Sequence, residues 1–178
     1  MSGRMGRAVA LSSAPSGEPT PCANSGSPLL NPRIMSLVTL KKKNYQSVLD
    51  VFPDEWVIAC FCAGWCKSCR GYHADLARLA RAYPKIAFFW IDIEEHADLM
   101  GDLDIDKFPS ILIQYRNMVT FFSCITADIG QLERIMGSLL REDEQELRRQ
   151  TQLSEERRMW QQTCNMKQML QRVCATTE

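Results

Sequence analysis

Residues 56–69 read WVIACFCAGWCKSC, and this stretch decides the fold of the chain. Its first half, residues 56–62, is a continuous apolar run, which predicts a strand buried on both faces. A helix after Cys66 is predicted by apolar residues at helical spacing, namely Leu76, Leu79, Ala80 and Tyr83. Cys66 and Cys69 therefore stand where a buried strand gives way to a helix.

This position suits Cys66 and Cys69 for thiol–disulfide chemistry. Two cysteines three residues apart at a helix start lie on one face and can close a small disulfide ring. The backbone N–H groups and the helix dipole at this end favour a thiolate. Cys66 lies at the open edge of the helix, so we expect it to be the nucleophile. Cys69 lies one turn further in and is expected to resolve the mixed disulfide.

The flanking sequence alternates between strand and helix patterns. Further strands are predicted at 37–40, 86–93, 110–115 and 118–124. The last two form a hairpin that turns at Arg116-Asn117, because Asn tolerates the left-handed conformation. Helices are predicted at 45–52, at 97–103 and from an Asp128 cap to Leu139. This order of elements predicts an α/β fold, a mixed central sheet with helices on both faces.

Two motifs carry a resemblance to a known family. The segment FCAGWCKSC resembles the active-site segment of the thioredoxin family, in which a strand runs through a small residue and Trp into C-x-x-C. Phe108-Pro109-Ser110 precedes a strand, as does the cis-proline loop of that family. The resemblance covers about residues 36–140.

The resemblance implies a thioredoxin fold with a redox-active Cys66–Cys69 disulfide. It also implies that Pro109 is cis and lies beside this disulfide, where the neighbouring backbone pairs with substrate. Trp65, Phe108 and Pro109 are then the substrate-binding residues. No bound cofactor or metal is expected, because electrons would come from an external donor similar to thioredoxin reductase.

Several positions depart from the family pattern. In place of the usual buried acid, its partner lysine, the helix-kinking proline and the glycine after the last strand, this chain has Cys60, Trp90, Ala74 and Ile125. The dipeptide between the cysteines is Lys67-Ser68 instead of Gly-Pro. We therefore expect a divergent member. Without the acid, mixed disulfides should resolve more slowly, with a steeper rise in rate toward alkaline pH.

Composition excludes some classes of partner. Lys plus Arg and Asp plus Glu each total 21, so nothing in the net charge favours nucleic acid or an anionic membrane. No apolar run approaches the roughly 20 residues of a membrane span. The eight cysteines are unevenly spaced, unlike a secreted disulfide scaffold, and the apolar stretch 8–11 is too short for a signal peptide. These features favour a reducing, cytoplasmic setting.

Three segments are expected along the chain. Residues 1–34, rich in Ser, Gly and Pro, are predicted to be a disordered tail or linker, unless Met35 is the true start. Residues 35–140 form the thioredoxin-like domain, and 141–178 form a charged helical extension. That extension could continue the preceding helix. Its apolar stripe consists of Met166, Met169, Leu170 and Val173. The stripe either folds back on its own domain, pairs with a second copy or binds a dedicated partner.

The sequence thus predicts a thiol–disulfide oxidoreductase that reduces or exchanges protein disulfides in cell redox homeostasis. One alternative keeps the fold but makes it an adaptor that holds a partner through the C-terminal helix. Another is a small zinc-binding protein that uses Cys66, Cys69 and His73, with Cys62 as a fourth ligand. Cys60 and Cys62 are otherwise expected to behave as buried free cysteines that pack as small hydrophobes.

Overall fold

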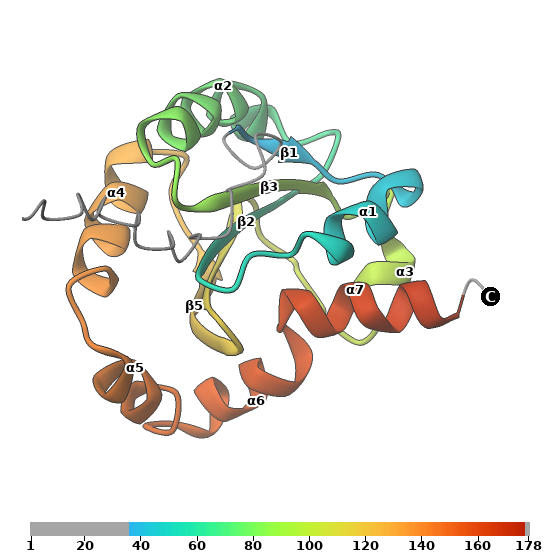
Figure 1. Cartoon of the computed structure of the whole chain (residues 1–178). Helices are drawn as coiled ribbons and strands as arrows, with labels where there is room; N and C mark the ends of the chain where they lie inside the picture. Colours follow the sequence, from blue (N-terminus) through green and yellow to red (C-terminus); the bar gives the residue numbers. More distant parts are fainter. Residues whose placement is uncertain (1–35, 177–178) are drawn as a thin grey trace, which may run out of the picture.

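A five-stranded mixed sheet organises residues 36–176, the part of the chain that this computed structural model describes (Figure 1). Its strands are β1 (Val38–Thr39), β2 (Trp56–Cys62), β3 (Ala87–Asp92), β4 (Ser110–Tyr115) and β5 (Met118–Cys124). They lie in the order β1-β3-β2-β4-β5. β3 runs parallel to β1 and β2, whereas β4 is antiparallel to β2 and β5. The central strand is therefore β2, which leads directly into the two cysteines.

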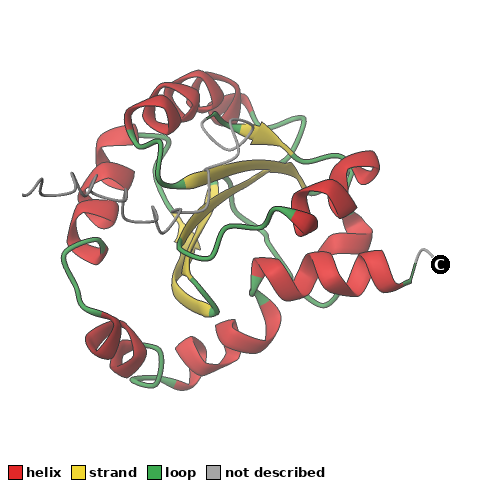
Figure 2. Ribbon diagram, viewed as in Figure 1, coloured by secondary structure: helices red, strands yellow, loops and turns green. Residues whose placement is uncertain are grey.

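Helices cover both faces of this sheet, as Figure 2 shows. The helices are η1 (Lys42–Asn44), α1 (Tyr45–Asp50), α2 (Lys67–Ala82), α3 (Ala97–Met100), α4 (Ile129–Leu139), α5 (Glu144–Gln150), α6 (Glu155–Thr163) and α7 (Met166–Ala175). α2 and α4 pack on one face, and α1, α3 and α7 pack on the other. α5 and α6 lie against the outer strand β5. The predicted α/β fold with a mixed sheet and flanking helices is confirmed.

Strand β2 divides its side chains between the two faces. Val57, Ala59 and Phe61 belong to the core under α1 and α7, whereas Ile58, Cys60 and Cys62 belong to the core under α2. All six are buried, as the continuous apolar run predicts. The alternation places Cys60 and Cys62 on the same side of the sheet as Cys66 and Cys69.

The hairpin turn differs from the prediction in one detail. The strands of the hairpin have the predicted bounds, and the turn lies at Arg116-Asn117. However, the left-handed residue is Arg116, with φ 53°, and not Asn117. Contacts of the Arg116 side chain support this conformation, because its guanidinium lies over the Tyr115 ring and pairs with Glu144 at 2.6 Å.

The extension after residue 140 forms three separate helices and does not continue α4. Each of the three begins at a residue whose side-chain oxygen accepts a hydrogen bond from the first turn. These caps are Asp143, Ser154 and Asn165. Such caps satisfy backbone N–H groups that a helix start leaves without partners. Three caps within the extension therefore divide it into α5, α6 and α7.

The apolar stripe of α7 is part of the domain core. Met166, Met169 and Leu170 are fully buried, Val173 is nearly so, and all four belong to the core under α1 and α3. The expectation that the stripe folds back on its own domain is confirmed. The apolar face of α7 is therefore covered by its own domain and offers no exposed surface for self-association or partner binding.

Polar side chains of the extension also hold the hairpin. The amide of Gln161 on α6 accepts from the N–H of Val119 and donates to its carbonyl oxygen, both at 2.8 Å. The buried side chain of Gln114 on β4 accepts from the N–H of Met166 at 2.8 Å and donates to the carbonyl oxygen of Arg116. Because β5 is an outer strand, the two Gln161 bonds pair backbone groups of Val119 that would otherwise be exposed at a sheet edge.

Two expectations concern other parts of the chain. The predicted tail, residues 1–34, lies outside the described residues. Among residues 36–176, no helix combines the length and the apolar character that crossing a membrane requires.

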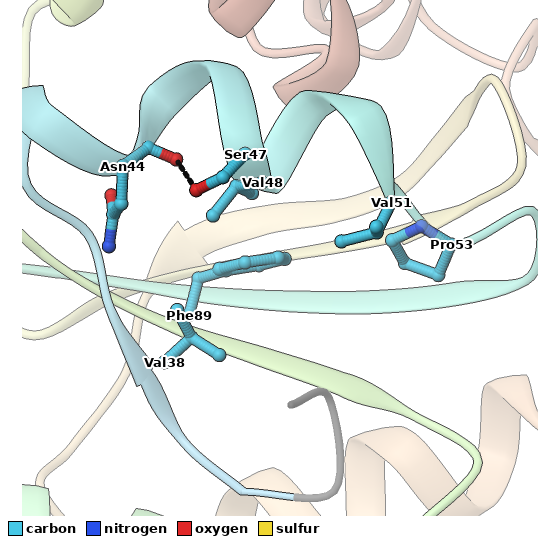
Figure 3. Close-up of a pocket in the computed structure, with 7 residues that line it drawn as sticks. All are labelled: Val38, Asn44, Ser47, Val48, Val51, Pro53 and Phe89. Carbon is cyan, nitrogen blue, oxygen red and sulfur yellow. Dashed lines mark hydrogen bonds between the residues drawn. The ribbon is translucent and has the colours of Figure 1, made fainter. Parts of the chain in front are cut away.

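An apolar pocket lies between α1 and strands β1 and β3 (Figure 3). Its lining consists of Val38, Asn44, Ser47, Val48, Val51, Pro53 and Phe89. Val48 and Phe89 belong to the core under α1, on the side of the sheet opposite the four clustered thiols. This pocket is therefore separate from the cysteines, and its lining contains no thiol or ionisable side chain.

Candidate active site

The loop between β2 and α2 brings the two predicted catalytic cysteines together. Cys66 is the N-cap residue of α2, with extended backbone, and its N–H donates to the carbonyl oxygen of Ala63 at 2.9 Å. Cys69 lies in the first turn of α2 and donates from its Sγ to the Sγ of Cys66 at 2.6 Å. Cys66 is 6% exposed and Cys69 is 2% exposed. The thiols thus meet at the N-terminal end of the helix.

The two thiols have different acidities. Burial alone would raise the pKa of Cys66, but hydrogen bonds from Cys69 and Ser68, through their side chains and backbone N–H groups, leave it lowered. The Oγ of Ser68 lies 3.1 Å from the Sγ of Cys66. Burial raises the pKa of Cys69, and hydrogen bonds with Cys62 and Cys66 raise it further. Cys66 is therefore the thiol that more readily becomes a nucleophilic thiolate.

The predicted substrate-binding residues lie beside Cys66. Trp65 is 66% exposed, and its ring meets the edge of Phe108 with centroids 5.6 Å apart. The Phe108–Pro109 peptide bond is cis, as the resemblance implies, and the carbonyl oxygen of Pro109 accepts from the N–H of Ile125 at 3.1 Å. Trp65, Cys66 and Phe108 line one shallow depression. An exposed aromatic surface thus adjoins the nucleophile.

Cys124 also lines this depression, which the sequence did not indicate. It is the last residue of β5, and it pairs across the hairpin with Ser110, the residue after cis-Pro109. The predicted turn at Arg116-Asn117 pairs the two strands, but the register shift between Ile113 and Gln114 that places Cys124 opposite Ser110 is visible only in the structure.

A second depression lies on the other side of the cysteines. Its lining is Cys62, Ala63, Gly64, Cys66, Cys69, Arg70, His73, Trp90 and Asp92. At the positions of the family's buried acid and lysine, Cys60 and Trp90 are direct neighbours in the β2–β3 register. Cys60 is fully buried, and the Trp90 ring packs against His73 with centroids 4.7 Å apart. A thiol and an indole therefore replace a charged pair beneath the active site.

The acidic end of β3 supports the active-site loop. Glu94 accepts from the N–H of Gly64 at 3.2 Å, and Asp92 accepts from the N–H of Glu94 at 3.1 Å. A side chain added at Gly64 would lie 3.3 Å from Asp92, which is tighter than ordinary contact. The two carboxylates therefore pack closely against Gly64, in the loop before Cys66.

The zinc alternative lacks a converging ligand set. Within residues 36–176, no group of three or more His, Cys, Asp or Glu side chains is arranged to hold a metal ion. The His73 ring lines the same depression as the thiols and forms an edge contact with Trp90. The arrangement is suited to exchange between sulfur atoms.

Solved structures share this architecture. A wild-type thioredoxin h from poplar aligns with a TM-score of 0.53 and 20% identity over 61% of this chain and 99% of its own. A structure described as a complex of ferredoxin:thioredoxin reductase and thioredoxin f2 aligns with a TM-score of 0.52 and 17% identity over 60% of this chain and 97% of that one. At these identities the likeness shows the fold alone.

Curated relatives are also thioredoxins. A putative thioredoxin 2 from Streptomyces coelicolor is 27% identical over 115 residues, 64% of this chain and 84% of the relative. A thioredoxin H-type from Fagopyrum esculentum is 30% identical over 57 residues, 32% of this chain, and the match spans 49% of its length. The thioredoxin family profile matches residues 36–126, just over half of the chain. Both active-site cysteines lie inside this match, and the chain belongs to the thioredoxin family.

Proposed function

We propose that the protein is a thiol–disulfide oxidoreductase that reduces or exchanges disulfides of protein substrates through Cys66 and Cys69. The observation that carries this proposal is the asymmetric thiol pair at the start of α2. Cys69 donates a hydrogen bond to Cys66, and the pKa of Cys66 is lowered while that of Cys69 is raised. These pKa directions favour Cys66 as the attacking thiolate and keep Cys69 protonated until the second step.

The cycle has two exchange steps. The Cys66 thiolate attacks a substrate disulfide, which forms a mixed disulfide and releases the first substrate sulfur as a thiolate. Cys69 then loses its proton and attacks the Cys66 sulfur, which closes the Cys66–Cys69 disulfide and releases the second substrate sulfur. The substrate gains two electrons and two protons, and the protein gives them up. Ser68 stabilises the attacking Cys66 thiolate, since its Oγ lies 3.1 Å away.

Trp65, Phe108 and Pro109 form the substrate-binding surface in this proposal. The aromatic pair provides exposed apolar contact area beside Cys66, and the backbone near Pro109 lies next to the same depression. A protein segment that presents a disulfide fits such an open surface better than a small molecule, which would need an enclosed pocket.

Reduction of the closed disulfide requires an electron donor. We assign this role to a thioredoxin-reductase-like protein in the cytoplasm. A structurally similar thioredoxin f2 is described in a complex with a ferredoxin:thioredoxin reductase, which supports a reductase as the kind of partner. The chain's own part of the cycle needs only the two thiols.

Insulin reduction with dithiothreitol tests the proposal. The wild-type chain should accelerate insulin precipitation, Cys66→Ser should abolish the acceleration, and Cys69→Ser should accumulate stable mixed disulfides. Cys174→Ser is the matched control, because it removes a half-buried thiol of α7 and should keep full activity. An inactive wild type, or alkylation of the reduced protein at Cys69 before Cys66 at neutral pH, would contradict the assignment.

A further inference from the structure

Two buried thiols outside the proposed cycle lie directly behind Cys69. Cys60 and Cys62 are both buried, and their Sγ atoms are 3.7 Å apart. Cys62 lines the same depression as Cys66 and Cys69, whereas Cys60 does not. Cys62 and Cys69 also interact, since each affects the pKa of the other. Cys69 therefore shares one depression and one core cluster with two other thiols, Cys66 and Cys62.

A buried hydroxyl near these thiols has no partner. The OH of Tyr72 is the one buried side-chain nitrogen or oxygen within residues 36–176 that makes no hydrogen bond. Tyr72 lies on α2 in the same core cluster as Cys60 and Cys62, and it interacts electrostatically with both. A buried donor without a partner is costly. Its cost would be offset when a negative charge forms on a neighbouring sulfur.

From this arrangement we propose that Cys62 is a third redox-active thiol, which exchanges with the Cys66–Cys69 disulfide to form a Cys62–Cys69 disulfide and a free Cys66. The inference rests on the proposed function, because it needs the Cys66–Cys69 disulfide as its starting point. Tyr72 acts as a positioning residue, whose hydroxyl donates to the Cys62 thiolate as it forms.

The exchange is balanced without an added oxidant or reductant. Cys62 loses its proton, and its sulfur attacks the Cys69 sulfur. The Cys62–Cys69 bond forms as the Cys66–Cys69 bond breaks, and Cys66 leaves as a thiolate, stabilised by Ser68. The number of disulfides stays at one. Only the identity of the free thiol changes, from a buried one to the nucleophile at the surface depression.

This exchange would change what the oxidised protein can do. With Cys69 held by Cys62, Cys66 can still attack a partner, but no resolving thiol is available to release the product. The oxidised protein would then hold partners in lasting mixed disulfides, whereas the same protein with the Cys66–Cys69 disulfide cannot react with them. The third thiol therefore regulates the choice between turnover and capture.

The direct test uses the full-length protein, oxidised with diamide, freed of the oxidant and then treated with iodoacetamide without unfolding. Trypsin places Cys60, Cys62 and Cys66 in peptide 44–67 and Cys69 in peptide 68–70. We expect a population in which the two peptides are linked through Cys62 while Cys66 carries the alkyl group. Fragmentation by tandem mass spectrometry identifies the linked cysteine.

Matched variants assign the third thiol. Cys62→Ala should lose the alkylated, linked species, and Cys60→Ala should keep it. Tyr72→Phe should lower its yield without lowering the melting temperature, because it removes a buried hydroxyl that has no partner. In a Cys66→Ser background, diamide should still link peptide 68–70 to 44–67, and adding Cys62→Ala should abolish the link. A link that persists in this double variant would assign the role to Cys60 and overturn the proposal.

The outcomes separate this inference from the proposed function. If wild-type protein reduces insulin but every linked species uses Cys66, then Cys62 has no redox role and only the further inference fails. If wild-type protein does not reduce insulin and forms no Cys66–Cys69 disulfide, the proposed function itself fails.

Discussion

Replacing Leu170 by alanine tests whether α7 is a part of the domain core. The Leu170 side chain is 0% exposed and packs in the cluster beneath α1 and α3. Truncation of a fully buried leucine to alanine costs about 2–5 kcal/mol, because it loses burial and leaves a cavity. For a chain of this size, each kcal/mol lowers the melting temperature by roughly 2–4 °C. Leu170→Ala should therefore melt about 4–20 °C below the wild type.

The assay is thermal unfolding followed by circular dichroism, with Met159→Ala on α6 as the control. Met159 is 54% exposed, so its truncation should change the melting temperature little. Insulin reduction measured well below the melting temperature should be similar for both variants, because α7 lies on the face of the sheet opposite the thiols. Equal melting temperatures for both variants and the wild type would refute the placement of α7 in the core.

Three further predictions concern the thiols and the sheet edge. Ser68→Ala removes a hydrogen bond to the Cys66 thiolate, so the pKa of Cys66 should rise and alkylation at neutral pH should slow, as a pH series with iodoacetamide would show; an unchanged profile contradicts the role of Ser68. Gln161→Ala leaves both backbone groups of Val119 without their partner and should cost about 1–3 kcal/mol in urea unfolding, whereas Gln161→Glu should retain at most the bond from the Val119 N–H. The hydrogen bond with Cys60 and burial raise the pKa of Cys62 in the folded state. Since this pKa lies above the value near 8.5 of an unfolded thiol, the free energy of unfolding of the reduced protein should be unaffected by ionisation of Cys62 below about pH 8.5 and should fall as the pH rises further. Cys62→Ala should show a smaller fall in the free energy of unfolding over the same pH range. Parallel curves for the variant and the wild type would contradict the raised pKa of Cys62.

The sequence allowed the central part of the fold and the candidate site to be predicted for local reasons. The run 56–62 and the helical spacing after Cys66 are short-range patterns, and both elements have the expected place. The role of Ser68 as a hydrogen-bond partner of Cys66 was within reach of the same reasoning, because it stands two residues away at a helix start. By contrast, the place of Cys124 opposite Ser110 depends on a register shift between Ile113 and Gln114, which the predicted turn does not encode.

The extension shows where reasoning from composition alone was incomplete. Charged residues and good helix formers suggested a single helix that continues α4. The caps Asp143, Ser154 and Asn165 were visible in the sequence and mark three helix starts. The sequence could not predict where α7 packs, since an apolar stripe can equally face its own sheet, a second copy or a partner. Removing residues 150–178 would therefore remove part of the core.

The chemistry beneath the active site follows from replacing two residues together. Cys60 and Trp90 are neighbours across β2 and β3, at the positions where the family has a buried acid and its lysine. Removing one member of such a pair leaves a buried charge without a partner, which is strongly destabilising, whereas removing both is tolerated. With Cys60 in place of the acid, Cys62 and Cys69 lie in a cluster of thiols and apolar side chains in which burial raises the pKa of Cys69. A site without a buried carboxylate disfavours the Cys69 thiolate that releases substrate. Once the Cys66–Cys69 disulfide has closed, its Cys69 sulfur becomes the electrophile that the proposed Cys62 exchange requires.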